Sequence, residues 1–349
     1  MIHLYDLSFD ELAELVAEYG QPAYRATQIW HWLYTAKAGA IDDMTNLPKA
    51  LRQRLAATAR VGCMAVVAEQ TAHDGTHKRL YRLPDGQLIE SVLMRYADGR
   101  RTACISTQAG CAMGCVFCAT GQMGFARHLS VGEILEQVVH FARQLEADGE
   151  RLSNVVLMGM GEPLHNYDAT LAAITRMTAP DGLGIGQRHI TLSSVGLVPA
   201  IRRFADEKLQ VGLAISLHAT DDAARSALLP VNHRWPIEEL MEACRYYIEQ
   251  TGRRVTFEWA LIHGKTDTLA EAEALGQLLS DILCHVNVIP LNPPDGDEGT
   301  PSDPERVQRF MDTLRSYGVS SSVRVRRGIE IDAGCGQLKA AVLRQPPGD

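Results

Sequence analysis

Three closely spaced cysteines are the residues of this sequence best suited to chemistry. The segment from Cys111 to Cys118 reads C-x3-C-x2-C, with Cys115 as its middle cysteine. Cysteine thiolates bind zinc and iron–sulfur clusters. Both kinds of site usually take four protein ligands, so the three cysteines raise the question of what the fourth ligand is.

Two kinds of metal site answer that question differently. A zinc site would need a fourth protein ligand, such as His128 or Cys104, and the chain has no second C-x-x-C pair downstream. A four-iron, four-sulfur cluster held by three thiolates would leave one iron open to a small-molecule ligand. A chance group of buried cysteines is a weaker third interpretation.

The region after residue 102 alternates between strand and helix patterns, which predicts the scaffold for these cysteines. Apolar, β-rich runs occur at 103–107, 154–158, 189–193, 211–218, 255–262 and 285–291, with helical patterns between most of them. Ser130 with Glu133 and Ser302 with Glu305 have the spacing of helix caps, and Pro236 opens another helix. This rhythm predicts a parallel sheet with functional residues at the carboxyl ends of its strands.

The strand count and the flanking regions define the expected domain organisation. Six units are too few for an eight-fold barrel, so we predict an α/β fold with a partial (β/α)6 barrel over 98–349. Residues 1–60 read as a small helical domain, with a capping box at Ser8 and Glu11. Residues 61–97 read as a β-hairpin linker region around the turn PDG at 84–86.

Composition limits the class of protein. A chain of 349 residues with 46% hydrophobic and 22% charged residues has ample core without disulfides. The sequence has no apolar run long enough for a membrane span and its start lacks the pattern of a secretory signal, so we expect a cytoplasmic protein with reduced thiols. The net charge of −8 argues mildly against a generally basic nucleic-acid-binding surface.

The cysteine motif, placed in the loop after the first strand of a partial barrel, resembles the radical S-adenosylmethionine enzymes. The resemblance implies one 4Fe-4S cluster on Cys111, Cys115 and Cys118, with S-adenosylmethionine on the open iron. Phe117, just before the last cysteine, also fits the family pattern. The resemblance thus answers the opening question: the fourth ligand is the cofactor.

The same resemblance implies further contacts with S-adenosylmethionine at the strand ends. In GMGEP at 159–163, Gly161 and Glu162 stand where the family holds the amino group of the cofactor. The other implied contacts are Ser194, Ser216, Leu217, His218 and Asn292.

Two more cysteines narrow the resemblance to one branch. Cys104 lies seven residues before the motif, and Cys335 lies between two glycines in DAGCGQL near the C-terminus. With the match over the N-terminal helices and residues 42–52, this pattern resembles the RlmN branch of the RlmN/Cfr RNA adenosine methyltransferases. In that family the equivalents of Cys104 and Cys335 are the catalytic pair. We interpret the remaining three cysteines as small buried apolar residues: Cys63, Cys244 and Cys284.

The family's chemistry implies a role for each of these residues. Cys335 takes a methyl group from one S-adenosylmethionine, and a 5′-deoxyadenosyl radical made from a second removes a hydrogen from that methyl. The carbon radical joins carbon 2 of the adenine, and Glu90, in QLIESVLM, is the implied base that removes the proton there. Cys104 then attacks the sulfur of Cys335 and releases methylated RNA through a transient disulfide. For Glu90, an exposed strand carboxylate is the alternative.

The resemblance also implies the partners. These are 23S rRNA, at an adenosine of the peptidyl-transferase region, and tRNAs, at the adenosine 3′ of the anticodon. Five basic residues of the N-terminal domain could help to grip such RNA: Arg25, Lys49, Arg52, Arg54 and Arg60. An electron donor such as a flavodoxin or ferredoxin would reduce the cluster, and we expect a monomer.

Two other functions compete with this one. A Cfr-type enzyme would methylate carbon 8 instead, but Pro163 fits the RlmN pattern. A non-catalytic iron–sulfur or zinc module that binds RNA would need neither Cys104 nor Cys335.

Overall fold

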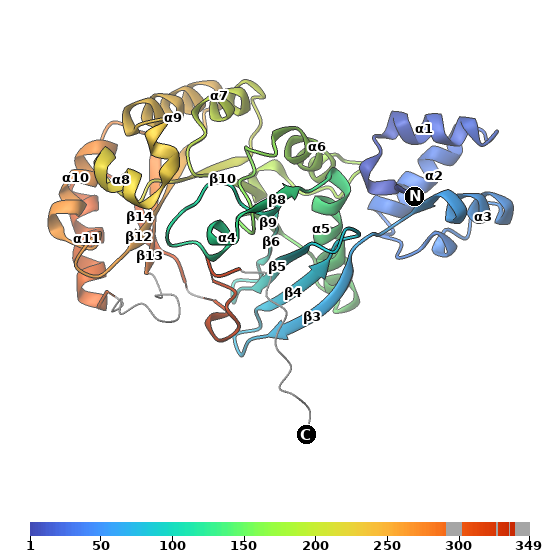
Figure 1. The fold of residues 1–349 in the computed structure, drawn as a ribbon, viewed down its shortest axis with the longest axis horizontal. Helices are drawn as coiled ribbons and strands as arrows, with labels where there is room; N and C mark the ends of the chain where they lie inside the picture. The colour runs from blue at the N-terminus through green and yellow to red at the C-terminus, as the bar shows by residue number, and fades with distance from the viewer. Residues whose placement is uncertain (291–301, 326, 335, 339–349) are drawn as a thin grey trace.

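The computed structural model describes residues 1–290, 302–325, 327–334 and 336–338. At one end of the molecule, the N-terminal residues form a small helical unit (Figure 1). It consists of α1 (Phe9–Glu18), α2 (Tyr24–Tyr34) and α3 (Lys49–Thr58), joined by the parallel pair β1 (Ile2–His3) and β2 (Ala59–Arg60). The capping box at α1 is confirmed, because the backbone N–H of Glu11 donates to Ser8 Oγ and that of Ser8 to Glu11 Oε2.

One ten-stranded sheet carries the rest of the chain, in the order β14-β13-β12-β11-β10-β9-β6-β5-β4-β3. Within this sheet, neighbouring strands from β6 through β9 to β14 pair in parallel. They are β6 (Arg101–Cys104), β9 (Asn154–Leu157), β10 (Ile190–Ser194), β11 (Gly212–Ser216), β12 (Val255–Leu261), β13 (Cys284–Pro290) and β14 (Ser321–Val323). The six predicted barrel strands and the partial barrel are confirmed, and the short β14 adds a strand that the sequence pattern did not indicate.

The predicted hairpin region, residues 61–97, contains one strand more than a hairpin and belongs to the same sheet. It forms three antiparallel strands, β3 (Ala65–Thr71), β4 (His77–Arg82) and β5 (Leu88–Arg95), and β5 pairs with β6. The turn at 84–86 joins β4 to β5 as predicted. Because hydrogen bonds run without a break from β3 into the barrel, this extension has fixed geometry relative to the barrel strands.

Helices cover the outer face of the curved sheet (Figure 1). They are α5 (Val131–Ala147), α6 (Tyr167–Thr178), α7 (Val198–Asp206), α9 (Ile237–Thr251), α10 (Leu269–Leu279) and α11 (Pro304–Ser316). The short α8 (Asp222–Leu228) instead lies beside the cysteine loop, where the backbone N–H of Val116 donates to the carbonyl of Leu228 at 3.1 Å. Ser130 caps α5 as predicted. The cap predicted at Ser302 is wrong: Asp303 caps α11 by accepting from the backbone N–H of Arg306, while the Ser302 hydroxyl donates to Asp267.

Smaller elements complete the described ranges. A two-stranded sheet of β7 (Gln108–Gly110) and β8 (Phe125–His128) flanks the short helix α4 (Ala119–Gln122). The 3-10 turns are Leu4–Asp6, Ile41–Asp43, Gln187–His189, Pro230–His233 and Ile329–Ile331. Among the described residues, no helix combines the length and apolar character that crossing a membrane would need.

Candidate active site

The cysteine loop leaves the sheet directly after β6 and is closed at its base by the β7–β8 pair. The backbone N–H of Cys111 donates to the carbonyl of Gly124 at 2.9 Å. Gly110, with φ of 73°, is required there because a Cβ would lie 2.0 Å from the Gly124 oxygen. Cys115 is buried, whereas Cys111 and Cys118 are half-buried. The backbone therefore fixes the loop while its thiols remain accessible from one side.

The three thiols line one cavity at the carboxyl ends of the barrel strands. Phe117 lines it too, with five of the predicted cofactor contacts: Gly161, Glu162, Ser194, Ser216 and His218. Leu217 is instead fully buried in the hydrophobic core, and Asn292 lies outside the described residues. Its lining combines apolar side chains with a few polar and ionisable groups, as is usual for small-molecule and cofactor sites in proteins.

The donor set of this cavity suits an iron cluster. Burial raises the pKa of Cys111 to about 11 and raises that of Cys115 further, and the neighbouring thiols add to both shifts. Bound metal ions reverse such shifts, because a coordinating thiol binds the metal as a thiolate and releases its proton to solvent. Three thiols that face a common cavity are therefore well arranged to become thiolate ligands of a cationic group.

Glu162 is a buried carboxylate at the wall of the cavity. Its oxygens accept from the backbone N–H of Leu164 at 3.1 Å and of Val195 at 2.9 Å. Burial raises its pKa to about 7, against the lowering effect of these hydrogen bonds. Gly161, with φ of 100°, lets the loop approach, since a Cβ there would lie 2.5 Å from Gln108. The site thus offers an acceptor that gains full charge only above neutral pH.

A pH dependence of cofactor binding follows from Glu162. Ionised carboxylate binds an amino group better than the neutral acid, so the affinity for S-adenosylmethionine is expected to rise several-fold, up to about tenfold, from pH 6 to pH 7.5. Isothermal titration of the cluster-loaded protein measures this change. Glu162→Gln should bind more weakly at pH 7.5 and flatten the profile; an equally steep profile in that variant would exclude Glu162 as the titrating group.

His218 faces the cavity as a neutral imidazole. Its Nδ1 accepts from the backbone N–H of Ala260 at 3.0 Å, so Nε2 carries the hydrogen. Burial lowers the pKa of His218 to about 3. Phe117 packs edge-on against the ring with centroids 4.8 Å apart. His218 is therefore a fixed hydrogen-bond donor rather than a proton carrier at neutral pH.

Arg225 is a positioning residue that sequence reasoning missed. Its guanidinium is fully buried and donates to the carbonyls of Val195 at 2.7 Å and Ser216 at 3.0 Å. Burial lowers its pKa to about 10, so it stays charged at neutral pH. Arg225 thereby ties together the ends of β10 and β11, which carry predicted cofactor contacts. A single arginine in a short helix gives no sequence signal of this role.

Glu258 and Arg324 add a charged pair to the cavity wall. Glu258 is buried on β12, accepts from Asn287 Nδ2 at 3.0 and 3.2 Å, and lies 3.6 Å from Arg324 Nη1. Burial raises the pKa of Glu258 while Arg324 lowers it. The sequence signal was present, because an acidic residue in the middle of an apolar parallel strand is unusual.

A second cavity adjoins the first and contains Cys104. The two cavities share Met158, Ile289, Arg324 and Leu338 as lining residues. Gly334 lines the cavity of Cys104, and Gly336 lines the cavity of the three cysteines. Cys335 itself lies outside the described residues. The two glycines on either side of Cys335 thus line one cavity each, that of Cys104 and that of the three cluster cysteines.

The C-terminal segment is attached to the cysteine loop by hydrogen bonds. The backbone N–H of Ala119 donates to the carbonyl of Gly336 at 2.8 Å, and the Thr120 hydroxyl to that of Leu338 at 2.6 Å. Gly336, with φ of 76°, packs so closely that a Cβ would lie 3.1 Å from the Phe117 oxygen. The two segments, about 220 positions apart in the sequence, therefore form one structural unit.

Glu90 is buried, which removes the exposed-carboxylate alternative. Its residue exposure is 3%, and Lys78 Nζ lies 3.3 Å from its Oε1. Lys78, Val92 and Cys104 form a row across β4, β5 and β6, and Glu90 lies two residues from Val92. Because side chains alternate along a strand, Glu90, Lys78 and Cys104 share one face of the sheet.

Lys78 links Glu90 to the C-terminal segment, and sequence reasoning missed it. The Lys78 ammonium also donates to the carbonyl of Asp332 at 3.4 Å. The side chains of Lys78 and Glu90 are 9% and 4% exposed, so this ion pair is largely desolvated. In the segment HKRLYRL, charged and apolar residues occur on both faces of the strand, which hid the direction of Lys78.

Loss of Lys78 is expected to destabilise the protein. Lys78→Met leaves the buried Glu90 carboxylate without its lysine and should lower the free energy of unfolding by about 3 kcal/mol. The double variant Lys78→Met/Glu90→Gln should recover most of this loss, because it removes both charges. Urea unfolding of the cluster-free protein measures both, with the exposed Lys265→Met as control. An unchanged free energy of unfolding in Lys78→Met would contradict the pairing.

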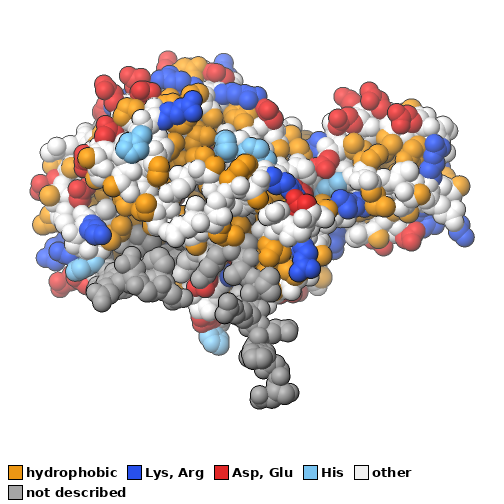
Figure 2. Space-filling view, in the orientation of Figure 1, with side chains coloured by type: hydrophobic (Ala, Val, Ile, Leu, Met, Phe, Trp, Pro, Cys, Tyr) orange, Lys and Arg blue, Asp and Glu red, His pale blue; other side chains and the backbone are white. Residues whose placement is uncertain are grey.

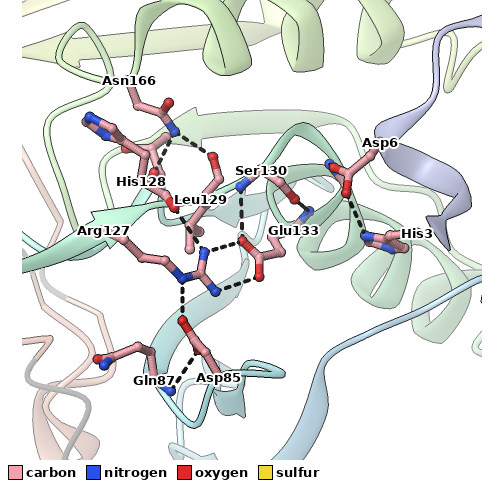
Figure 3. A network of polar contacts seen from close by, with 12 residues as sticks. His3, Asp6, Asp85, Gln87, Arg127, His128, Leu129, Ser130, Glu133 and Asn166 are labelled. Atoms are coloured by element: carbon pink, nitrogen blue, oxygen red, sulfur yellow. Dashed lines mark hydrogen bonds and ion pairs between the residues drawn. The ribbon is translucent and has the colours of Figure 1, made fainter. Parts of the chain in front are cut away.

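Figure 3 shows a network of polar contacts that connects β8, α5 and the β4–β5 turn. Arg127 on β8 donates to both oxygens of Glu133 at 2.7 and 2.8 Å and also to Asp85 in the β4–β5 turn. His128, one of the candidate zinc ligands, contacts Gln108 at 3.0 Å and packs against His165. His128 is not among the residues that line the cysteine cavity.

A partial barrel with three cysteines after its first strand, facing a cavity that the predicted cofactor contacts also line, defines a radical S-adenosylmethionine enzyme. Comparison with known proteins agrees: residues 105–275 match the radical SAM superfamily, and residues 2–61 match the N-terminal domain of ribosomal RNA large subunit methyltransferases. The chain belongs to the RlmN family of RNA methyltransferases. As a radical SAM enzyme it uses a 4Fe-4S cluster and S-adenosylmethionine.

Individual relatives carry this assignment over nearly the whole chain. Dual-specificity RNA methyltransferase RlmN 1 of Myxococcus xanthus is 55% identical, covering 98% of this chain and 96% of the relative. A probable RlmN of Chloroflexus aurantiacus is 50% identical, covering 96% and 92%. The crystal structure of a radical SAM methyltransferase from Sphaerobacter thermophilus has a TM-score of 0.95 at 50% identity, covering 98% and 100%.

Proposed function

We propose that this protein methylates carbon 2 of an adenosine in the peptidyl-transferase region of 23S rRNA and of the adenosine 3′ of the anticodon in tRNAs. The observation that carries the proposal is the junction of the two cavities. The cavity of the three cysteines adjoins the cavity of Cys104, and the glycines on either side of Cys335 line one cavity each. The names of the relatives, which describe dual-specificity RNA methyltransferases, support the proposal of two RNA substrates.

The cofactor site is assigned to the residues of the first cavity. Cys111, Cys115 and Cys118 hold the cluster, and Glu162 with Gly161 receives the amino group of S-adenosylmethionine. The remaining assigned contacts are Ser194, Ser216, Leu217, His218 and Asn292. When bound, the cluster and cofactor supply a methyl group and one-electron chemistry at carbon. The neutral His218 offers a donor of fixed orientation to this site.

Cys335 and Cys104 divide the transfer between them. The Cys335 thiolate accepts the methyl group and later links it to the adenine. Cys104 then attacks the Cys335 sulfur, which frees the RNA and forms a disulfide that an external thiol reduces. Cys104 is buried on a strand whose backbone is fixed by β5 and β9, so its thiol has a fixed place in the second cavity.

Glu90 is the proposed base that removes the proton from the modified carbon. Its place on the same sheet face as Cys104 puts the base and the releasing thiol on neighbouring strands. Lys78 orients Glu90 through the 3.3 Å ion pair. The carboxylate is therefore held in a fixed position in a largely desolvated site.

RNA binding is assigned to the N-terminal helical domain, residues 1–60. Helix α1 carries Asp10, Glu11, Glu14 and Glu18, whereas α3 carries Lys49, Arg52 and Arg54. Figure 2 shows acidic side chains gathered over the part of this unit where α1 lies. Because phosphates bind basic surfaces, the α3 side is the face that contacts RNA.

The remaining assignments concern the partner protein and the state of the enzyme. A flavodoxin or ferredoxin reduces the cluster, and the enzyme is monomeric and cytoplasmic.

Nucleoside mass spectrometry tests the function. The reconstituted protein is incubated without oxygen with a 23S rRNA fragment or a tRNA, S-adenosylmethionine and a reductant. We expect new 2-methyladenosine, and none with Cys335→Ala. Formation of 8-methyladenosine would place the enzyme with the Cfr type, and an unmodified RNA despite an intact cluster would contradict the proposed substrates.

A further inference from the structure

A second group of metal-binding residue types lies away from the active site, between the N-terminal unit and helix α5. His3 on β1, Cys63 just after β2 and Glu136 on α5 each offer one ligand atom, and these atoms all lie within 4.8 Å of one another. His3 and Glu136 are 6% and 2% exposed, and Cys63 is half-buried. The sequence alone gave Cys63 only the role of a small apolar residue.

The imidazole of His3 is the observation that points to a ligand. Within the described part of the chain, neither of its buried ring nitrogens makes a hydrogen bond. Nε2 lies 3.4 Å from Glu136 Oε2, longer than a usual N–H···O bond. Two ligand atoms bound tetrahedrally to zinc at their usual bond lengths are about 3.4 Å apart. The separation is thus the one that a shared metal ion would set.

The other nitrogen of His3 faces a carboxylate. Nδ1 lies 3.7 Å from Asp6 Oδ2, and Figure 3 shows the His3 ring turned toward Asp6. Histidines that bind metals usually direct their second nitrogen to a carboxylate, which fixes the tautomer. Asp6 is itself held in place, because its Oδ1 accepts from the backbone N–H of Gly132 at 2.7 Å.

The surroundings hold the three ligands in position. Glu136 accepts from the backbone N–H of Cys63 at 2.9 and 3.1 Å and of Met64 at 3.1 Å. Two glycines make the space: a Cβ at Gly132 would lie 2.3 Å from His3 Nδ1, and one at Gly62 would lie 2.7 Å from Glu136 Oε1. The backbone thus brings the carboxylate and imidazole together before any ion binds.

We propose that His3, Cys63 and Glu136 bind a zinc ion that joins the N-terminal unit to the barrel, with Asp6 orienting His3. Nitrogen, sulfur and oxygen ligands together match zinc rather than calcium or magnesium, and water completes the fourth position. The ion connects β1 and the segment after β2 with α5. The inference is independent of the RNA substrate and of the active-site cluster.

Metal analysis of the full-length protein tests the site. The 4Fe-4S cluster is reconstituted first, so that iron and not zinc occupies the three cluster thiols. We expect about one zinc per chain beside the iron by plasma mass spectrometry. His3→Ala and Cys63→Ser should each lose most of this zinc, whereas the exposed His31→Ala and the half-buried Cys284→Ser should keep it. A wild-type protein without zinc, or variants that all retain it, would overturn the proposal.

Cobalt exchange gives a second readout that does not depend on the His3 variant folding. It is measured in protein carrying Cys111→Ala, Cys115→Ala and Cys118→Ala, in which the cluster thiols are absent. A cobalt ion bound to Cys63 should show one thiolate charge-transfer band, which Cys63→Ser removes while the d–d bands remain. Failure to bind cobalt would identify His3 and Glu136 as a simple imidazole–carboxylate pair.

Discussion

Replacing Cys104 with alanine is expected to leave the protein covalently bound to its RNA. Cys335 would still accept the methyl group and join it to the adenine, but the thiol that frees the sulfur would be missing. Multiple turnover should fall by about a hundredfold or more. A denaturing gel shows the adduct as a band whose mobility depends on RNA length, and peptide mass spectrometry locates the link.

The matched control for this experiment is Cys244→Ala. Cys244 is likewise buried, but it lies on α9 in the hydrophobic core rather than in either cavity. Its replacement should leave turnover near the wild-type value after correction for stability. The adduct should also disappear from Cys104→Ala when Cys335→Ala is added. Free methylated RNA from Cys104→Ala at the wild-type rate would exclude Cys104 as the releasing thiol.

Glu90→Gln is expected to stop the reaction one step earlier than Cys104→Ala. Without the base, the adenine is joined to the Cys335 methylene but keeps its carbon 2 hydrogen. RNA deuterated at carbon 2 separates the two cases. The adduct of Cys104→Ala should have lost the deuterium, whereas any adduct of Glu90→Gln should retain it, and turnover should fall by about a hundredfold or more.

The control for Glu90→Gln separates chemistry from folding. Glu69→Gln, which changes an exposed carboxylate on β3, two strands away from β5, that pairs with Arg79, should have little effect on turnover. The deuterium content of the adduct is independent of how much protein folds, so partial destabilisation does not obscure the result. Loss of deuterium in the Glu90→Gln adduct would assign the proton transfer to another group.

The scaffold of the site could be predicted from sequence because its signals are local. Apolar runs of strand length mark the six parallel strands, and Ser8 and Ser130 with glutamate three residues later mark helix starts. In a strand–helix alternation these runs also fix which ends of the strands meet. The cysteine motif and the GMGEP loop could therefore be assigned to one edge of the sheet before the fold was known.

The charged residues around the site could not be predicted, because their partners are distant in sequence or on another strand. Lys78 meets Glu90 only through the antiparallel register of β4 and β5, and Arg225 meets carbonyls at the ends of two other strands. A charge in a short strand or helix is usually exposed, so burial of these side chains needs the tertiary structure. Asp303 displaced Ser302 as a cap for a similar reason, since the Ser302 hydroxyl is engaged by Asp267.

The hydrogen bonds from Ala119 and Thr120 to Gly336 and Leu338 couple the cysteine loop to residues 336–338. Whatever free energy the metal contributes to ordering the cysteine loop is shared with the C-terminal segment, and by thermodynamic reciprocity docking of that segment favours retention of the metal. A chain that has lost its cluster would thus hold residues 336–338 less firmly, and a chain in which this segment is displaced would lose its cluster more easily.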